Sequence, residues 1–278
     1  TFINQIRALR VVEDNLTFTE VGGLGAIKEC YSALAAGPLS PVGWLWIDEI
    51  EKLFAGAGSL GDSSGVSQDQ LATFLTLFQL YKWTGSLLVG HPGTGKSLMA
   101  STAAKTHGGV CIAFDTGAAK GSLVGESEKY IRAAFKAVYA IGCELIHVIA
   151  TCNALDSLKP EMRRRFSTPW FFDLPTKEER DTIWTISFQR YKLDEKQPKP
   201  EDEGWSGGEI EKCCKTAYML KKTVAEAACY IIPIIRSDPE AIKKLRDQAS
   251  NRWLSASYPG AYRPETEKTT EGQRRIKL

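Results

Sequence analysis

The sequence lacks the features that mark membrane proteins, secreted proteins and strongly basic nucleic-acid binders. No apolar run reaches the ~18 residues that a membrane-spanning helix requires. Residues 1–7 contain no long apolar stretch of the kind found in a signal peptide. The formal net charge is only +2, so overall charge does not favour nucleic acid as a partner. We therefore expect a cytoplasmic protein without a membrane partner.

Histidine and cysteine do not occur in patterns that predict a metal site or a disulfide framework. The three histidines form no HExxH motif. The seven cysteines include no CxxC pair, which predicts reduced and mostly buried thiols. The remaining composition, 43% hydrophobic and 24% charged over 278 residues, is typical of a globular protein with one large domain or two smaller ones.

What the sequence does contain is a phosphate-binding loop. Residues 90–97, GHPGTGKS, match the pattern GxxxxGK[ST] without a gap, between an apolar strand candidate (86–89) and an alanine-rich helix candidate (98–105). Glycines let backbone N–H groups turn toward phosphate oxygens, and the helix N-terminus adds partial positive charge. We expect Lys96 to bridge the β and γ phosphates and Ser97 to place its hydroxyl on Mg²⁺. A glycine-rich turn without a ligand is the less favoured alternative.

An acidic strand end precedes this loop in the chain. Residues 44–47 are continuously apolar, as in a strand buried on both faces of a parallel sheet, and Asp48 and Glu49 follow. Because successive strand residues point to opposite faces, we assign Asp48 to the metal and Glu49 to the general base that polarises the attacking water. The acidic start of a helix is the alternative interpretation.

A third apolar run, residues 146–151, is followed by Asn153, whose amide is suited to position a water near the γ-phosphate. Three consecutive arginines follow at 163–165. Such a run is usually a solvated face or a nucleic-acid patch. At this distance after Asn153 it can instead supply an arginine finger to a nucleotide on a neighbouring copy of the chain.

Together these motifs resemble the AAA family of the AAA+ ATPases over most of the chain. Residues 18–24 (FTEVGGL) resemble the family's adenine-contacting segment, residues 124–128 (VGESE) the stretch beside the central pore, and residues 205–210 (WSGGEI) the start of a lid-domain helix whose backbone contacts the nucleotide. The resemblance implies an α/β P-loop NTPase fold. Its parallel five-stranded sheet, in the order 5-1-4-3-2, would be flanked by helices and followed by a small α-helical lid domain.

The resemblance also implies ATP and Mg²⁺ as cofactors and assigns a role to each matching residue. The implied catalytic residues are Glu49, Lys96, Asn153, Arg164 and Arg165, the last two favoured within the arginine run. The implied nucleotide-binding residues are Val21, Gly22, Pro92, Gly93, Thr94, Gly95, Lys96, Ser97, Leu98, Gly207 and Gly208. Asp48 and Ser97 would hold the metal. The implied pore loop is Leu123, Val124 and Gly125, although the family usually carries an aromatic residue at the place of Leu123.

The expected domains are a nucleotide-binding α/β domain over 1–174, with the adenine-contacting segment at 16–26, a helical lid over 175–262 and a polar, disordered tail over 263–278. Apolar spacing predicts lid helices over 176–191, 208–222, 224–235 and 239–255, with Pro233 kinking or ending the third. The Gly/Ser-rich residues 55–69 predict a mobile loop, which is either a second substrate-touching loop or a plain connector.

The order of the motifs differs from that of the family, because the acidic strand comes before the phosphate loop. Exchanging residues 41–79 with 80–142 restores the family order. In the transposed order each altered crossover keeps the right-handed sense. The linkers 80–85 and 141–145 need to cover only one additional strand spacing of ~4.8 Å. We therefore expect Asp48 and Ser97 to meet in space, whether the transposition is natural or engineered.

The leading functional prediction is an ATP-hydrolysing AAA module that acts as a ring, a hexamer by resemblance to the family. Such a ring would remodel or translocate a macromolecule, which we expect to be a protein. One alternative is an ATPase acting on nucleic acid in replication, transposition or packaging, although the sequence shows neither a basic pore nor a DNA-binding element. Another is a nucleotide-gated scaffold with little turnover, against which the intact Glu49 and Asn153 argue.

Overall fold

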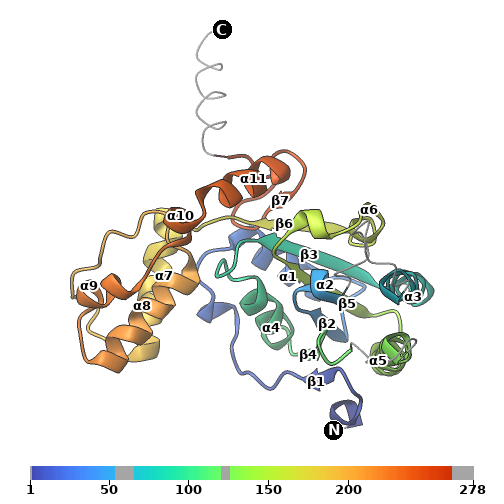
Figure 1. Cartoon of the computed structure of the whole chain (residues 1–278). Helices are drawn as coiled ribbons and strands as arrows, with labels where there is room; N and C mark the ends of the chain where they lie inside the picture. Colours follow the sequence, from blue (N-terminus) through green and yellow to red (C-terminus); the bar gives the residue numbers. More distant parts are fainter. Residues whose placement is uncertain (1, 54–65, 120–125, 265–278) are drawn as a thin grey trace. The chain divides into compact units, whose positions relative to one another are not determined.

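The computed structural model describes residues 2–53, 66–119 and 126–264 (Figure 1). The predicted pore loop, most of the predicted loop 55–69 and most of the predicted tail lie outside the described residues. The chain divides into two compact units. Unit 1 comprises residues 1–19, 28–89 and 96–169, and unit 2 comprises residues 20–27, 90–95 and 170–278. The domain boundary expected at residue 174 remains a prediction.

The strands are β1 (Leu9–Val11), β2 (Gly43–Ile47), β3 (Thr84–Gly90), β4 (Val110–Phe114), β5 (Ile146–Cys152), β6 (Thr168–Phe172) and β7 (Leu254–Ser255). The α-helices are α1 (Gly25–Ala36), α2 (Ile50–Leu53), α3 (Val66–Leu80), α4 (Lys96–Thr106), α5 (Glu126–Gly142), α6 (Pro160–Arg163), α7 (Lys177–Tyr191), α8 (Gly207–Leu220), α9 (Val224–Ala227), α10 (Ile234–Ser237) and α11 (Pro239–Ala249). Short 3₁₀ helices cover Phe2–Gln5, Phe18–Glu20, Leu155–Ser157 and Ala228–Tyr230.

The strands form one mostly parallel sheet in the order β1-β4-β2-β5-β3-β6-β7. If β3, which enters the phosphate loop, is taken as the family's first strand, the run β6-β3-β5-β2-β4 is the expected order 5-1-4-3-2. The α/β fold class is confirmed, but the sheet formed by the described residues has seven strands rather than five. Strand β1 pairs antiparallel with β4, and β7 pairs parallel with β6. Both additional strands have three residues or fewer, too short for an alternating pattern to reveal.

The helices of unit 1 lie where a common crossover handedness requires them. The connection from β3 to β4 crosses the sheet in one direction, and those from β2 to β3 and from β4 to β5 cross it in the other. Therefore α4 must lie on the face opposite α3 and α5, and Figure 1 shows this arrangement. Side chains agree, since Cys111 Sγ lies 3.9 Å from the Ala100 oxygen of α4, whereas the Phe114 ring packs 5.9 Å from that of Phe135 on α5.

Periodic apolar residues explain how these helices attach. Helix α5 buries Ile131, Ala134, Phe135 and Val138, which follow the i, i+3, i+4, i+7 spacing of one helical face. The Phe135 ring packs 5.3 Å from that of Phe74 on α3, and both rings are fully buried. Helices α3 and α5 therefore form one layer over the same face of the sheet.

The two linkers singled out in the sequence are built alike. Residues 81–83 join α3 to β3, and residues 143–145 join α5 to β5. Each contains one residue with a left-handed backbone, Lys82 with φ 51° and Cys143 with φ 49°. Trp83 Nε1 donates to the Cys143 oxygen at 2.8 Å, and Lys82 Nζ pairs with Glu144 at 3.0 Å. Three-residue connections are therefore sufficient for the altered crossovers.

The helices of unit 2 start at defined capping residues. Helices α7, α8 and α9 each begin with a capping box, formed by Thr176 with Glu179, Ser206 with Glu209, and Thr223 with Glu226. Their apolar faces meet in a buried cluster that includes Trp184, Phe188, Trp205 and Ile210. The aromatic residues of this region are therefore core residues, as the sequence indicates.

Three predicted boundaries in this chain were wrong. The predicted helix 224–235 is shorter, since α9 ends at Ala227 and a 3₁₀ turn follows; Pro233, which was expected to kink or end this helix, is the N-cap of α10. The predicted helix 239–255 ends at Ala249; Asn251 is left-handed, with φ 55°, and the chain turns into β7. The predicted loop 55–69 ends earlier, since α3 begins at Val66. Among the described residues, no helix is both long and apolar enough to cross a membrane.

Candidate functional site

In unit 1, three segments far apart in the sequence meet at the carboxyl edge of the sheet. Ser97 Oγ, in the first turn of α4, donates to Asp48 Oδ1 at 2.9 Å. Thr151 Oγ1 donates to the same carboxylate oxygen at 2.6 Å. The register of the parallel strands, with Ile47 opposite Ala150, places Asp48 beside Thr151. The two predicted metal ligands, Asp48 and Ser97, are therefore in direct contact.

The predicted base and the predicted water-positioning amide also contact each other. Asn153 Nδ2 donates to Glu49 Oε1 at 3.1 Å. The Glu49 N–H donates to Thr151 Oγ1 at 2.9 Å, and Glu49 has a left-handed backbone with φ 48°. For a residue with a Cβ this conformation is costly and is often retained at functional sites. The second carboxylate oxygen of Glu49 forms an ion pair with Lys52.

Lys96 is a buried cation beside these carboxylates. Its side chain is only 5% exposed, and burial lowers the pKa of its ammonium to about 8, an effect that Cys152, Glu51, Asp48 and Glu49 oppose. Removing a charged ammonium from water is unfavourable unless anions compensate it. Its surroundings therefore favour binding of an additional anionic group.

In unit 2, the backbone of the loop Gly90–Gly95 makes close contacts, and within the loop Thr94 Oγ1 donates to the His91 oxygen at 2.8 Å. Gly93 and Gly95 have φ values of 81° and 94°, in the left-handed region that glycine tolerates best. The Gly208 N–H, at the start of α8, donates to the Gly93 oxygen at 2.8 Å. A Cβ added to Gly93 would lie 2.9 Å from Ser206 Oγ. The loop and the Ser-Gly-Gly segment, both expected at a nucleotide, therefore contact each other.

The N-terminal segment of unit 2 brings in the remaining predicted nucleotide-binding residues. Val21 is buried, and a Cβ added to Gly22 would lie 2.4 Å from Ile183 of α7. The Leu24 N–H donates to Glu179 Oε1 at 3.0 Å, and Leu24 Cδ1 would lie 3.3 Å from a Cβ added to Gly95. Of the remaining predicted contacts, Thr94 is buried, Leu98 and Gly207 are half-buried, and Pro92 is exposed.

The three arginines differ in their surroundings. Arg163 Nε and Nη2 donate to the oxygens of Leu158 and Leu155 at 3.0 and 2.8 Å, so its guanidinium is used within the chain. Arg164 is exposed and Arg165 is half-buried. Among the described residues, neither makes a side-chain hydrogen bond. This difference favours Arg164 and Arg165 over Arg163 as groups that reach another molecule.

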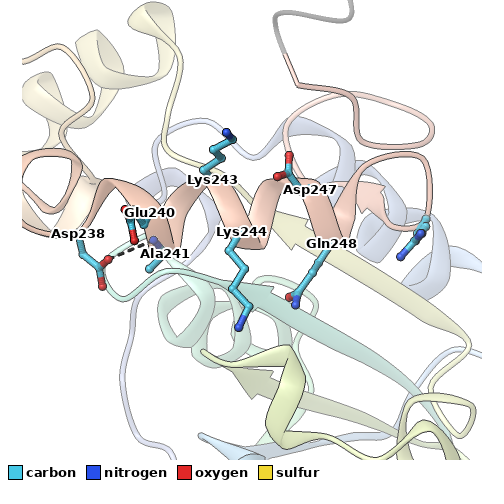
Figure 2. Close-up of a pocket in the computed structure, with 8 residues that line it drawn as sticks. Asp238, Glu240, Ala241, Lys243, Lys244, Asp247 and Gln248 are labelled. Carbon is cyan, nitrogen blue, oxygen red and sulfur yellow. Dashed lines mark hydrogen bonds between the residues drawn. The ribbon is translucent and has the colours of Figure 1, made fainter.

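Two hollows differ in their relation to these residues. A hollow of about 400 Å³ in unit 1 is lined by Trp46, Asp48, Glu49 and Lys52, so solvent reaches the predicted base. A hollow of about 760 Å³ in unit 2 lies along α11, where Lys243 and Lys244 project to different sides of the helix (Figure 2). The second hollow contains none of the predicted site residues.

The structure adds three residues that sequence reasoning missed. Thr151 connects Asp48 to the Glu49 backbone, Lys52 pairs with Glu49, and Glu179 holds the predicted adenine-contacting segment at Leu24. The position of Thr151 at the end of a buried strand was a usable signal, because this is where polar residues reach the carboxyl edge. The sequence gives no comparable signal for the contact of Glu179 with Leu24, which are 155 positions apart.

Part of this chain is similar to known proteins. Residues 86–143 match the ATPase family associated with various cellular activities (AAA). An uncharacterised AAA domain-containing protein, ycf46 of Guillardia theta, is 25% identical over 222 residues, which cover 60% of this chain and 44% of that protein. A katanin p60 ATPase-containing protein of Xenopus laevis is 28% identical over 157 residues, which cover 50% of this chain and 31% of that protein.

A solved structure from work on the structural basis of katanin self-assembly has the same fold. It superposes with a TM-score of 0.52 at 17% identity and covers 86% of this chain and 93% of its own. The predicted resemblance to the AAA family is therefore confirmed over residues 86–143, and the fold is shared with this solved structure. The chain spans less than half the length of the curated relatives it matches.

Proposed function

We propose that the chain is an ATP-hydrolysing AAA module. The observation that carries this proposal is the contact of Ser97 Oγ with Asp48 Oδ1 at 2.9 Å. The two residues are 49 positions apart, lie in reversed order relative to the family, and still meet at one edge of the sheet. Lys96, Glu49 and Asn153 surround this pair with the groups that phosphoryl transfer to water requires.

The donor set fits Mg²⁺ and a nucleoside triphosphate. A serine hydroxyl and a carboxylate are oxygen ligands of the kind that Mg²⁺ prefers, and Mg²⁺ keeps several of its waters. Asp48 and Ser97 would hold this ion, which when bound supplies charge neutralisation to the phosphates. Gly93 and Gly95 leave the loop's N–H groups free of side chains, and Lys96 is a buried cation beside the loop.

The chain's own residues account for the hydrolytic step. Glu49 would take the proton from a water whose oxygen forms the new bond to the γ-phosphorus, while the β–γ bridging oxygen leaves with the diphosphate. Asn153 donates to Glu49 Oε1 and so orients the base. Lys96 compensates negative charge on the phosphate oxygens.

We further propose that copies of the chain assemble into a ring, a hexamer by resemblance to the family, and act on a protein. Arg164 or Arg165 would then complete the site of the neighbouring copy, because both side chains remain available. The fold shared with a structure from work on katanin self-assembly supports assembly, and the protein substrate is proposed by resemblance to the family. Action on nucleic acid, or a scaffold with little turnover, is less well supported.

The decisive experiment compares ATPase rates of the wild type, Lys96→Ala and Glu49→Gln, together with oligomer mass. Lys96→Ala should lose nucleotide binding and turnover. Glu49→Gln should retain nucleotide binding and lose at least ~100-fold in turnover, the usual contribution of a positioned base. Chelation of Mg²⁺ should abolish wild-type turnover.

Glu144→Gln is a matched control, because Glu144 is also a partly exposed glutamate of unit 1 that pairs with a lysine. It should leave turnover unchanged. Unchanged turnover in Glu49→Gln would contradict the assignment of the base. Retained nucleotide affinity in Lys96→Ala would contradict the assignment of the loop. DNA binding that falls steeply with salt would favour the nucleic-acid alternative.

A further inference from the structure

We infer that Lys52 restrains the proposed base Glu49 and thereby limits basal ATP turnover. This inference rests on the proposed function. Lys52 forms an ion pair with Glu49 Oε2, while Asn153 Nδ2 occupies Oε1 at 3.1 Å. Both carboxylate oxygens of the base therefore already accept hydrogen bonds. Lys52 is a positioning residue and does not contact the reacting atoms.

The local backbone presents the Lys52 ammonium to Glu49. The turn at Glu49 is fixed by its left-handed φ of 48° and by its N–H bond to Thr151. The Lys52 N–H donates to the Glu49 oxygen at 2.8 Å, and Ile50 and Leu53 anchor the short helix α2 in the core. Lys52 therefore projects outward at position i+3, on the same side of this turn as the Glu49 carboxylate.

The ion pair with Lys52 and the bond from Asn153 fix the direction in which the Glu49 carboxylate points. To take a proton from water, Glu49 must turn a free lone pair toward that water, and the ion pair with Lys52 opposes this movement. Glu49 raises the pKa of Lys52, so the ammonium remains charged at neutral pH. The Lys52 side chain is not part of the phosphate loop, so its restraint acts on the base and not on nucleotide binding.

The exposure of the pair sets the size of the expected effect. The Lys52 side chain is 59% exposed and that of Glu49 is 36% exposed. Exposed ion pairs are weak, because water screens them and two flexible side chains must be ordered. Release of the base should therefore change turnover by about two- to five-fold. Removal of the base itself should have a far larger effect.

The test measures kcat and nucleotide affinity for the wild type and Lys52→Met. We expect kcat of Lys52→Met to rise about two- to five-fold, with nucleotide affinity unchanged. Lys52→Arg, which keeps a cation at this position, should retain the low wild-type rate. Lys82→Met is a matched control, since Lys82 also forms an exposed ion pair with a glutamate in unit 1, away from Glu49; its rate should equal that of the wild type.

Ionic strength gives a readout that a merely structural role would not move. Salt screens an exposed ion pair. A higher salt concentration should therefore bring the wild-type rate closer to that of Lys52→Met and reduce the ratio between the two rates. Lys52→Gln provides a second neutral variant if the methionine variant does not fold. Two results would overturn this inference and leave the proposed function intact. In the first, Lys52→Met and Lys52→Gln both turn over ATP at or below the wild-type rate, while turnover still depends on Glu49. In the second, the ratio of variant to wild-type rate does not change with salt. Wild-type turnover that Glu49→Gln does not reduce would overturn the proposed function and this inference with it.

Discussion

The carboxylate edge of unit 1 and the glycine loop of unit 2 are built in opposite ways. At the carboxylate edge, side chains contact side chains: Ser97 and Thr151 donate to Asp48, and Asn153 donates to Glu49. In the loop, backbone contacts backbone, as in the bond from the Gly208 N–H to the Gly93 oxygen. The first region depends on functional groups, and the second on the absence of side chains.

This difference predicts different sensitivities to substitution. At the carboxylate edge, a change that preserves shape and removes a hydroxyl or carboxylate should be damaging. In the loop, a change that adds one methyl group should be damaging although no functional group is lost.

The largest effect is expected from Gly93→Ala. The new Cβ would require a left-handed backbone, which costs about 1–2 kcal/mol for a residue with a side chain, and would lie 2.9 Å from Ser206 Oγ. Because the loop must shift, nucleotide affinity should fall by about 10- to 100-fold. Titration calorimetry with a non-hydrolysable triphosphate measures this loss.

Gly108→Ala is a matched control for this substitution. Gly108 has a similar φ of 73°, but a Cβ there has no heavy atom within 4 Å. The control should show the same backbone strain as a loss of thermal stability and should bind nucleotide normally. Equal affinity losses in both variants would show that strain alone, not the crowded loop, accounts for the effect.

A smaller effect is expected from Thr151→Val at the carboxylate edge. The substitution nearly preserves shape but removes the hydroxyl that donates to Asp48 and accepts from the Glu49 N–H. An unpaired buried polar group costs about 1–3 kcal/mol, so turnover should fall about ten-fold through misplacement of Glu49. Steady-state ATPase assays at saturating nucleotide and Mg²⁺ measure this loss.

Thr151→Ser separates the hydroxyl from the methyl group. The serine variant keeps both hydrogen bonds and should retain most of the turnover. A serine variant as slow as the valine variant would show that packing of this fully buried residue, rather than its hydroxyl, is important.

The sequence predicted the two regions unequally well. The phosphate loop and the acidic strand end were found from local spacing, because glycine at fixed positions and carboxylates after an apolar run are local signals. Their meeting in space followed from parallel strands sharing a carboxyl edge. The bond from Ser97 to Asp48 agrees with that expectation, although the two blocks are in reversed order.

Non-local contacts explain what the sequence did not predict. The additional strand β1 is held by pairing with β4, more than 100 positions away, and by Arg7, which donates to the Ala118 oxygen and to Tyr130. Glu179 likewise combines a local capping box with a distant bond to the Leu24 N–H. No local pattern specifies such partners, since they depend on how the chain folds back.

Lys96 connects the two regions, because it directly follows Gly95 of the loop and lies among the carboxylates. Burial lowers its pKa from 10.5 to about 8, so between these values the unfolded chain holds more protons than the folded chain. The contribution of Lys96 to the free energy of unfolding of the nucleotide-free protein should therefore become more favourable through this pH window. Chemical denaturation of the wild type and Lys96→Met at pH 8 and pH 10 should show that the free energy of unfolding of the wild type increases relative to that of the variant.

The same proton makes nucleotide binding dependent on pH, which is the smallest of these effects. The phosphates favour the charged ammonium of Lys96. Nucleotide binding at pH 8.5 should therefore be accompanied by uptake of a fraction of a proton, and this uptake should be nearly absent at pH 7. Calorimetry in two buffers of different ionisation enthalpy measures this uptake. Lys96→Arg, whose guanidinium stays charged, should bind without the uptake from this position. Equal proton uptake by both proteins would show that the carboxylates, rather than Lys96, exchange the proton. Lys96 would then act with the phosphate loop and not with the carboxylates.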